Sequence, residues 1–190
     1  MRSLTLGLIA ISVMRAIANA DDSQDEAWAW RSLSEGRAVL LLRHATAPGI
    51  GDPPNFALAD CATQRNLNET GQGEARRWGE LLKSKGILRP RLLSSRWCRC
   101  LETGSEIGLT EVEPLPLLDS FFVDSNRRVT QTDGLRRFLN ELPAPAPAVL
   151  ISHQVNITAL TGIFPRSGEG VIIQLPITDP VKVLARISPP

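Results

Sequence analysis

Two short, wholly apolar runs constrain the fold of this chain of 190 residues more than any other feature. Residues 38–42 read Ala-Val-Leu-Leu-Leu and residues 148–151 read Ala-Val-Leu-Ile, without the polar alternation of a strand that faces water. Runs of this kind are typical of strands that helices cover on both faces of a sheet. They predict an α/β fold in which each run is a buried central strand.

Helical patterns lie between the apolar runs. Positions 71, 75, 78 and 82 follow helical spacing, and Asn68 and Gly86 are suited to cap the two ends of this helix. A second amphipathic helix runs through residues 135–142 and stops at Pro143. Strands that alternate with helices need crossover connections, which make the strands parallel. We therefore expect a three-layer sandwich with a mostly parallel central sheet and helices on both faces.

One long stretch, residues 47–66, fits neither the helical nor the strand period and is rich in proline and glycine. The other segments predict helices over 25–36, 96–107 and 155–161, strands over 91–94, 171–175 and 181–187, and extended chain over 112–118. Irregular loops as long as residues 47–66 are usually functional when they lie inside a compact domain. We expect residues 47–66 to form a wall of the site.

The first twenty residues form a pattern of their own. Arg2 precedes an apolar run from Leu4 to Met14, and Ala18-Asn19-Ala20 then provides a small-x-small cleavage signature. We expect residues 1–20 to be a signal peptide and residues 21–190 a single domain. A retained anchor is the alternative, but Arg15 interrupts the run before it reaches the length of a stable membrane span. This interpretation predicts a periplasmic or secreted protein.

The charges almost cancel, with 21 Lys and Arg residues against 20 Asp and Glu residues. A large basic face for nucleic acid is therefore not expected, and a small molecule is the favoured partner. The sequence specifies no oligomeric state.

Three cysteines, Cys61, Cys98 and Cys100, remain after the predicted signal peptide. An oxidising compartment would allow one disulfide and leave one thiol. Three buried thiols are the alternative, and the pairing stays open because spacing does not reveal which side chains meet.

The only two histidines of the chain follow the two apolar runs. His44 comes two residues after the first run and His153 two residues after the second. In open parallel sheets the ligand crevice lies outside the carboxyl ends of the strands, so both imidazoles should point into it. A third strand end, at Ser94, leads into a helix that carries Arg99 within about one turn, so that Arg99 and Arg43 can meet one ligand.

This set of side chains fits a phosphoryl group. Two guanidinium groups in one small volume repel each other unless an anion is present, and their planar donors match the geometry of phosphate. A neutral imidazole is a nucleophile near pH 7, and a second one can stabilise charge on the phosphoryl oxygens. Neither a metal nor a cofactor is required.

At this point the sequence resembles the histidine phosphatase superfamily, the branch that includes the phosphoglycerate mutases, over nearly all of residues 38–175. The matching motifs, in the same order as in that family, are Leu42-Arg43-His44-Ala45, the helix entry over residues 66–74, Ser94-Ser95 through Arg99 to Thr103, and Ile151-Ser152-His153. Ala45 stands where the family usually has glycine, as in its small phosphohistidine phosphatases and their secreted relatives.

The resemblance implies a phosphoglycerate mutase-like fold and a phosphatase that hydrolyses a phosphomonoester through a phosphohistidine. It implies that His44 is the nucleophile and that Arg43, Arg99 and His153 bind the phosphoryl group. The family's proton donor, usually a glutamate, would be Asp119 here, with Asp124 as the alternative.

Further polar residues near the strand ends are candidate ligands of the substrate. We expect Thr46 to bind phosphate, and Gln64, Arg65 and Asn156 to contact the rest of the substrate. Ser94 and Ser95 are expected to satisfy backbone groups at the helix entry, because no second base remains to activate them.

Several alternatives share these residues. A non-catalytic phosphate-binding module would keep the pocket without a competent acid, and a phosphohistidine phosphatase or a phosphatase of the lipopolysaccharide core would differ only in substrate. A mutase needs a site enclosed enough to keep water from the phosphoenzyme. A redox protein built on Cys98 and Cys100 is disfavoured, because one intervening residue differs from the two of thioredoxin-like sites.

Overall fold

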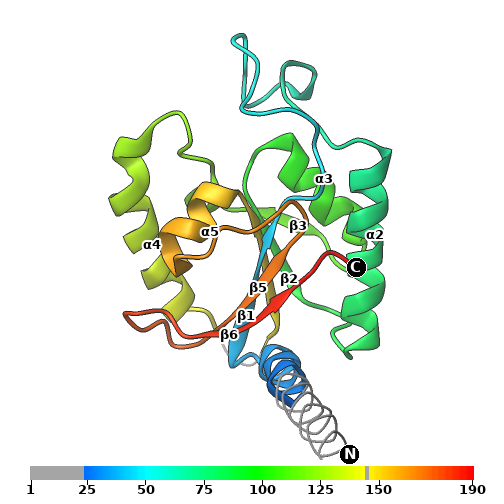
Figure 1. Ribbon diagram of the computed structural model, residues 1–190, viewed down its shortest axis with the longest axis vertical. Coiled ribbons are helices and arrows are strands. Elements are labelled where there is room, and N and C mark those ends of the chain that lie inside the picture. The colour runs from blue at the N-terminus through cyan, green and yellow to red at the C-terminus, as the bar shows by residue number, and fades with distance from the viewer. Residues whose placement is uncertain (1–23, 144–145) are drawn as a thin grey trace, which may run out of the picture.

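The computed structural model describes residues 24–143 and 146–190, so the predicted signal peptide lies outside the described residues. Its centre is a six-stranded sheet in the order β3-β2-β4-β1-β5-β6 (Figure 1). The strands are β1 (Ala38–Arg43), β2 (Arg91–Ser94), β3 (Val112–Pro114), β4 (Ala148–Ser152), β5 (Gly170–Gln174) and β6 (Val183–Ile187). Within the described ranges, no helix has both the length and the apolar character needed to cross a membrane.

The sheet is mostly parallel, as the sequence predicts. β1 and β2 each pair in parallel with β4, and β2 also pairs in parallel with β3. β5 runs antiparallel to β1, and β6 runs antiparallel to β5. The last two strands are joined by a connection without a helix, and such a connection suits antiparallel neighbours.

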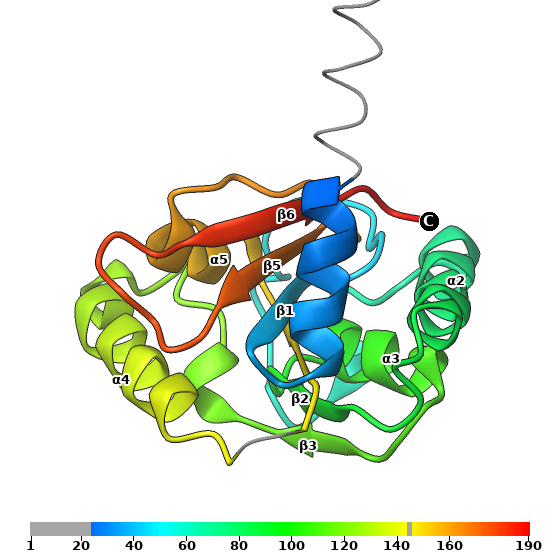
Figure 2. The same ribbon diagram turned by 90° about the horizontal axis from the view of Figure 1, so that it is seen from below.

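Helices cover both faces of the sheet and make a three-layer sandwich (Figure 2). α2 (Glu69–Ser84) and α3 (Cys98–Ile107) pack on one face together with the helical residues 24–34. α4 (Arg128–Asn140) and α5 (Gln154–Thr161) pack on the other. Alternate residues of β1 divide between the two layers: Leu40 and Leu42 face the first, and Val39 and Leu41 the second. The uninterrupted apolar run is therefore buried on both sides.

The caps and close contacts of α2 fix its position. Asn68 accepts a hydrogen bond from the backbone N–H of Gly71 at 2.9 Å, which confirms the predicted N-cap. In the middle of the helix, a Cβ atom on Gly79 would lie 2.2 Å from the carbonyl oxygen of Ile107 in α3. Only glycine allows α2 and α3 to approach this closely.

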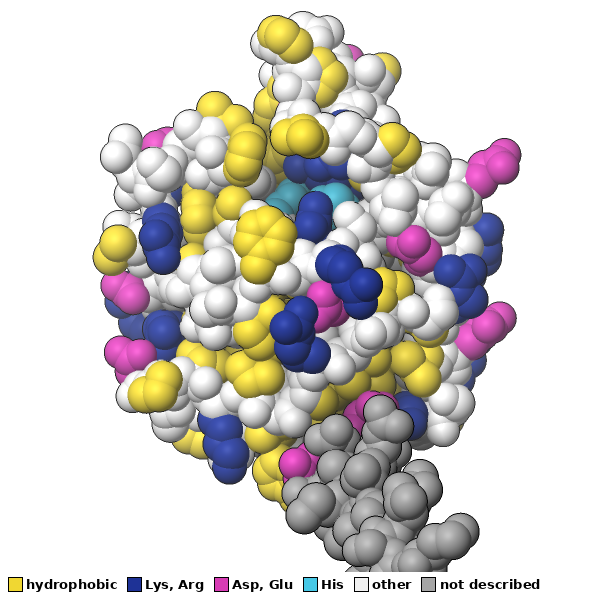
Figure 3. Space-filling model, viewed as in Figure 1, with side chains coloured by type: hydrophobic (Ala, Val, Ile, Leu, Met, Phe, Trp, Pro, Cys, Tyr) yellow, Lys and Arg dark blue, Asp and Glu magenta, His cyan; other side chains and the backbone are white. Residues whose placement is uncertain are grey.

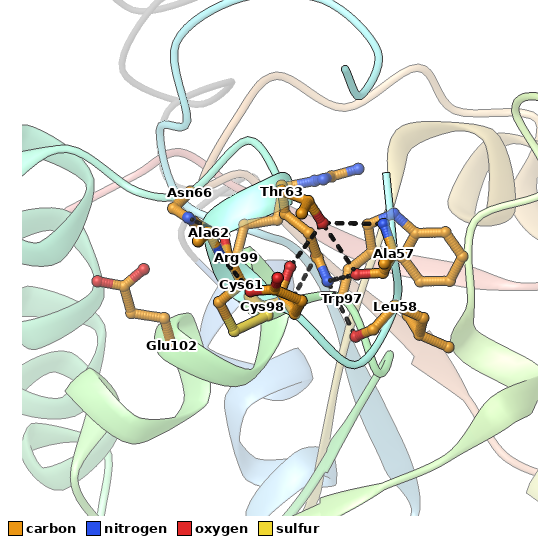
Figure 4. Close-up of a disulfide and its surroundings, with 12 residues drawn as sticks. Ala57, Leu58, Cys61, Ala62, Thr63, Asn66, Trp97, Cys98, Arg99 and Glu102 are labelled. Atoms are coloured by element: carbon orange, nitrogen blue, oxygen red, sulfur yellow. Dashed lines mark hydrogen bonds between the residues drawn. A yellow bond between two sulfur atoms is a disulfide. The ribbon is translucent and has the colours of Figure 1, made fainter. Parts of the chain in front are cut away.

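The loop between β1 and α2 projects from the body of the molecule (Figure 1). It includes the 3-10 helix η1 (Cys61–Thr63), and a disulfide joins Cys61 to Cys98, the first residue of α3 (Figure 4). The remaining thiol, Cys100, is fully buried, and burial raises its pKa to about 12. The expected pattern of one disulfide and one free cysteine is therefore present, and Cys98 is the partner of Cys61.

Candidate active site

A cavity of about 710 Å³ opens where β1, β2 and β4 end, beneath the projecting loop. Its lining includes Arg43, His44, Arg99 and His153, so the four residues on which the phosphate-pocket prediction rests meet in one place. Figure 3 shows the histidine side chains at the bottom of a hollow, with basic and hydrophobic side chains around its opening.

The register of the sheet brings the two histidines together. Arg43 of β1 pairs with Ser152 of β4, so that the next residues, His44 and His153, leave neighbouring strands at the same level. The backbone N–H of His44 donates to the carbonyl oxygen of Ser152 at 3.0 Å. The imidazole centroids lie 5.5 Å apart, and the two residues are 2% and 4% exposed.

The ring of His44 is oriented by the backbone of the next residue. Its Nδ1 lies 2.8 Å from the carbonyl oxygen of Ala45, an acceptor, so Nδ1 carries the proton and donates. Nε2 is then left with its lone pair. Burial, followed by repulsion from Arg99, lowers the pKa of His44 to about 3. The imidazole is therefore neutral near pH 7 and has a free nitrogen with which to attack.

Arg43 and Arg99 are the cationic side chains that line the cavity beside the histidines. Arg43 donates through Nη1 to the carbonyl oxygen of Pro165 at 3.0 Å. Its Nε, like the Nε of Arg99, is buried and has no hydrogen-bond acceptor among residues 24–143 and 146–190. Burial, and then repulsion from Arg99, lowers the pKa of Arg43. Guanidinium groups in this condition favour an incoming anion.

Asp52 of the projecting loop occupies one of these guanidinium groups. Its two carboxylate oxygens lie 2.6 and 3.2 Å from Nη1 and Nη2 of Arg99, and Trp97 donates through Nε1 at 2.9 Å. Burial raises the pKa of Asp52, but the hydrogen bonds from Arg99 and Trp97 outweigh it, and the net pKa is lowered. The site thus contains an internal anion that the sequence did not reveal.

A hydrogen-bonded chain runs from His153 away from the cavity. Nε2 of His153 lies 2.9 Å from Oγ of Ser95, and this hydroxyl lies 3.3 Å from a carboxylate oxygen of Asp119. On the other side of the ring, Nδ1 faces Nη2 of Arg99 at 3.5 Å. Arginine can only donate, so Nδ1 accepts and Nε2–H donates to Ser95. Ser95 therefore orients this histidine, a role the sequence did not indicate.

Asp119 does not lie where a proton donor to the substrate would lie. It is fully buried, accepts two hydrogen bonds from the guanidinium of Arg96 at 2.6 and 2.8 Å, and accepts a third from the Arg96 backbone at 2.9 Å. It is not part of the cavity lining, whereas Asp124 and Asp52 are. This geometry corrects the expectation that Asp119 protonates the leaving group.

Three other predicted ligands also lie outside the cavity lining. The hydroxyl of Thr46 donates to Glu74 at 2.9 Å, because Thr46 turns toward α2. The amide of Gln64 bonds the backbone of the loop and accepts from the N–H of Cys98 at 3.0 Å, so it ties the loop to α3. The side chain of Asn156 donates to the carbonyl oxygen of Asp119 at 2.8 Å.

Arg65 does line the cavity. It donates to the carbonyl oxygens of Gly51, at 2.8 Å, and Ala47. It thereby holds the projecting loop in the conformation that presents Asp52.

No protein-family model and no curated protein matches the sequence. The structure, however, is similar to that of the protein histidine phosphatase SixA complexed with tungstate, at 21% identity and a TM-score of 0.56, over 80% of this chain and 97% of SixA. A putative phosphohistidine phosphatase SixA from Agrobacterium tumefaciens matches at 16% identity and a TM-score of 0.56, over 82% of this chain and 99% of that one.

A third similar structure is a mycobacterial glucosyl-3-phosphoglycerate phosphatase in complex with VO3. It matches at 17% identity and a TM-score of 0.54, over 77% of this chain and 96% of that one. These likenesses confirm the predicted fold: the chain has the phosphoglycerate mutase-like fold of the histidine phosphatases.

Proposed function

From the histidine phosphatase fold of this chain, we propose that it is a phosphatase that hydrolyses a phosphomonoester through a phosphohistidine on Nε2 of His44. The observation that carries the proposal is the state of His44, a buried neutral imidazole with Nδ1 bonded to the carbonyl oxygen of Ala45 and Nε2 free. Beside it lie two arginines whose Nε donors find no acceptor in the described part of the chain. The tungstate and VO3 bound to two proteins of the same fold support an oxyanion as the ligand.

The first chemical step transfers the phosphoryl group to the enzyme. The phosphate of the ester binds between Arg43 and Arg99, and Nε2 of His44 attacks phosphorus in line with the leaving oxygen. The new N–P bond forms as the P–O ester bond breaks, and the alcohol departs with a proton. Water then attacks the phosphohistidine, which releases inorganic phosphate and restores His44.

Asp52 is the proton donor in this proposal. The phosphate and Asp52 compete for the guanidinium of Arg99, so binding of the substrate displaces the carboxylate. A carboxylate that has lost its cation and lies next to phosphoryl oxygens has a raised pKa and takes up a proton. Asp52 is then an acid beside the leaving oxygen.

His153 stabilises the charge that spreads over the phosphoryl oxygens. Its Nδ1 faces the cavity beside Arg99, while its Nε2 is bonded through Ser95 to Asp119. Protonation of Nδ1 would give an imidazolium whose other N–H, on Nε2, already donates to the hydroxyl of Ser95. Asp119 thus acts at a distance, as a positioning residue for His153.

The test is hydrolysis of phenyl phosphate by the purified protein, together with trapping of acid-labile, base-stable phosphate on the chain. We expect turnover and label on the wild type, label but slow turnover in His153→Ala, and neither in His44→Ala. Vanadate binding without any turnover or label would replace this proposal with the non-catalytic phosphate-binding module.

We also propose that the protein works in an oxidising compartment after export. The signal-like pattern of residues 1–20 and the Cys61–Cys98 disulfide support this location, because disulfides persist outside the reducing cytosol. The intact mass of protein recovered from the periplasm or medium tests it. A mass that still includes residue 1 would contradict cleavage.

A further inference from the structure

The opening of the candidate active site is mainly apolar, whereas its floor carries the histidines and arginines. In the described ranges, seven large hydrophobic side chains are exposed to solvent, and four of them line this one cavity. They are Ile50, Phe122, Val123 and Phe164, which are 93%, 60%, 91% and 68% exposed. Exposed apolar side chains that gather at one opening, rather than lying singly on the surface, mark a binding site.

Three segments far apart in the sequence contribute to this apolar opening. Ile50, Pro53, Pro54 and Phe56 come from the loop after β1, Phe122 and Val123 from the segment before α4, and Phe164 from the connection after α5. Phe56 stacks on Trp97 at a centroid distance of 5.2 Å and an interplanar angle of 18°, which continues the apolar wall down toward His153. Apolar side chains therefore lie both around the opening, where Figure 3 shows hydrophobic groups beside the hollow, and deeper in the cavity next to His153.

We infer that the substrate is a phosphomonoester of a large apolar alcohol, an inference that rests on the proposed function. The phosphate binds the arginines at the floor, and the apolar part of the alcohol covers the side chains of the opening. A cavity of about 710 Å³ has room for both parts.

The polar residues of the opening fit a sugar poorly. Four polar side chains lie among the apolar ones, namely Ser120, Asp124, Arg127 and Gln154. The amide of Gln154 already donates to Thr158 at 2.8 Å. A sugar with several hydroxyl groups would lose more bonds to water against this wall than the remaining side chains could replace. An apolar group loses none and releases water from the exposed side chains.

The test uses alkylphosphonates, whose C–P bond cannot be cleaved by this chemistry, so that binding is measured without turnover. Calorimetry gives Kd for the series from ethylphosphonate to octylphosphonate, below the concentration at which the longer members form micelles. We expect each added methylene to lower Kd about fourfold until the opening is filled. Phenylphosphonate and hexylphosphonate, with equal carbon counts, distinguish an aromatic from an aliphatic occupant.

Two variants localise the effect. Phe122→Ser combined with Phe164→Ser should reduce the gain per methylene and leave the Kd of ethylphosphonate within about twofold. The matched control combines Leu88→Ser with Val129→Ser, two side chains of similar exposure, 61% and 68%, outside this cavity. It should bind the whole series like the wild type.

A Kd that stays flat from ethyl to octyl, or glycerol phosphate that competes as strongly as octylphosphonate, would overturn the inference. Failure of the proposed function gives a different result. Phenyl phosphate would not be hydrolysed, although Kd would still fall along the alkyl series.

Discussion

At the scale of single residues, the two histidines of the site are buried and their pKa values are lowered. Burial lowers the pKa of His44 to about 3 and that of His153 well below its ordinary value. Below about pH 6.5 the unfolded chain therefore binds protons at these positions that the folded chain does not. The neutral state of the proposed nucleophile, His44, is thus obtained at the expense of stability in acid.

This state of the histidines predicts the pH dependence of folding. As the pH falls from about 6.5 toward 3, each buried histidine should lower the free energy of unfolding by up to about 1.4 kcal/mol per pH unit. Urea denaturation of the wild type and His44→Asn at pH 7 and pH 4.5 measures the effect. The variant should lose less stability between the two values, and equal losses would contradict the neutral state of His44.

The proposed role of Asp52 as proton donor predicts that the effect of its substitution on the rate of hydrolysis depends on the leaving group. Asp52→Asn should slow hydrolysis of phenyl phosphate by about 100-fold or more, because this leaving oxygen needs a proton. Hydrolysis of dinitrophenyl phosphate, whose leaving group is stable as an anion, should change by less than about threefold.

A second readout follows from the ion pair with Arg99. Vanadate should bind Asp52→Asn more tightly than the wild type, since no internal anion competes for the guanidinium. Asp124→Asn is the matched control, because Asp124 also lines the cavity, and in the described part of the chain the carboxylate that binds Arg99 is that of Asp52. Equal slowing of both esters in Asp52→Asn would indicate that Asp52 only holds the loop in place.

At the scale of secondary-structure elements, the fit between α2 and α3 depends on the absence of one side chain. Gly79→Ala should lower the free energy of unfolding by about 1 to 3 kcal/mol, because its Cβ would meet the carbonyl oxygen of Ile107 at 2.2 Å. Gly73→Ala, in the same helix, would meet only the flexible end of Arg77 at 3.3 Å and should raise stability by up to about 1 kcal/mol. Chemical denaturation of the pair measures both, and equal changes would contradict the close packing.

The elements were predictable where a local signal defines them. β1 and β4 follow from uninterrupted apolar runs, α2 from its spacing and from the Asn68 cap, and the meeting of His44 and His153 from their positions after parallel strands. Side chains that depend on long-range contacts were not predictable. Thr46 adjoins the motif of the proposed nucleophile, yet it bonds Glu74. Asp119 stands where the resembled family usually has a glutamate, yet it pairs with Arg96.

Asp52 shows the same limit in a different way, because it lies in the site although no local sequence signal identified it. It lies in an irregular loop that has no period to orient its side chain, and its contact with Arg99 spans 47 positions of sequence. Its neighbours Gly51, Pro53 and Pro54 indicate a turn but not its direction. Only the folded chain reveals that the loop returns to the floor of the cavity.

At the scale of the whole molecule, the Cys61–Cys98 disulfide fastens the projecting loop to the body. It closes a segment with a sequence separation of 37, so loop-closure entropy predicts that it contributes about 4 kcal/mol to the free energy of unfolding. Urea denaturation with and without a thiol reductant should give that difference for the wild type. Cys61→Ala combined with Cys98→Ala should be insensitive to the reductant, and an insensitive wild type would contradict the bond.

The disulfide also bears on the choice of substrate, because it fastens one wall of the cavity. Its two ends are the loop that carries Ile50, Asp52 and Phe56, and the residue next to Arg99. Without this bond, the loop would be held to α3 by noncovalent contacts such as those of Gln64 with Cys98 and of Asp52 with Trp97 and Arg99. If the protein is exported as proposed, oxidation would fasten this wall covalently, so that the compartment as well as the sequence would shape the pocket.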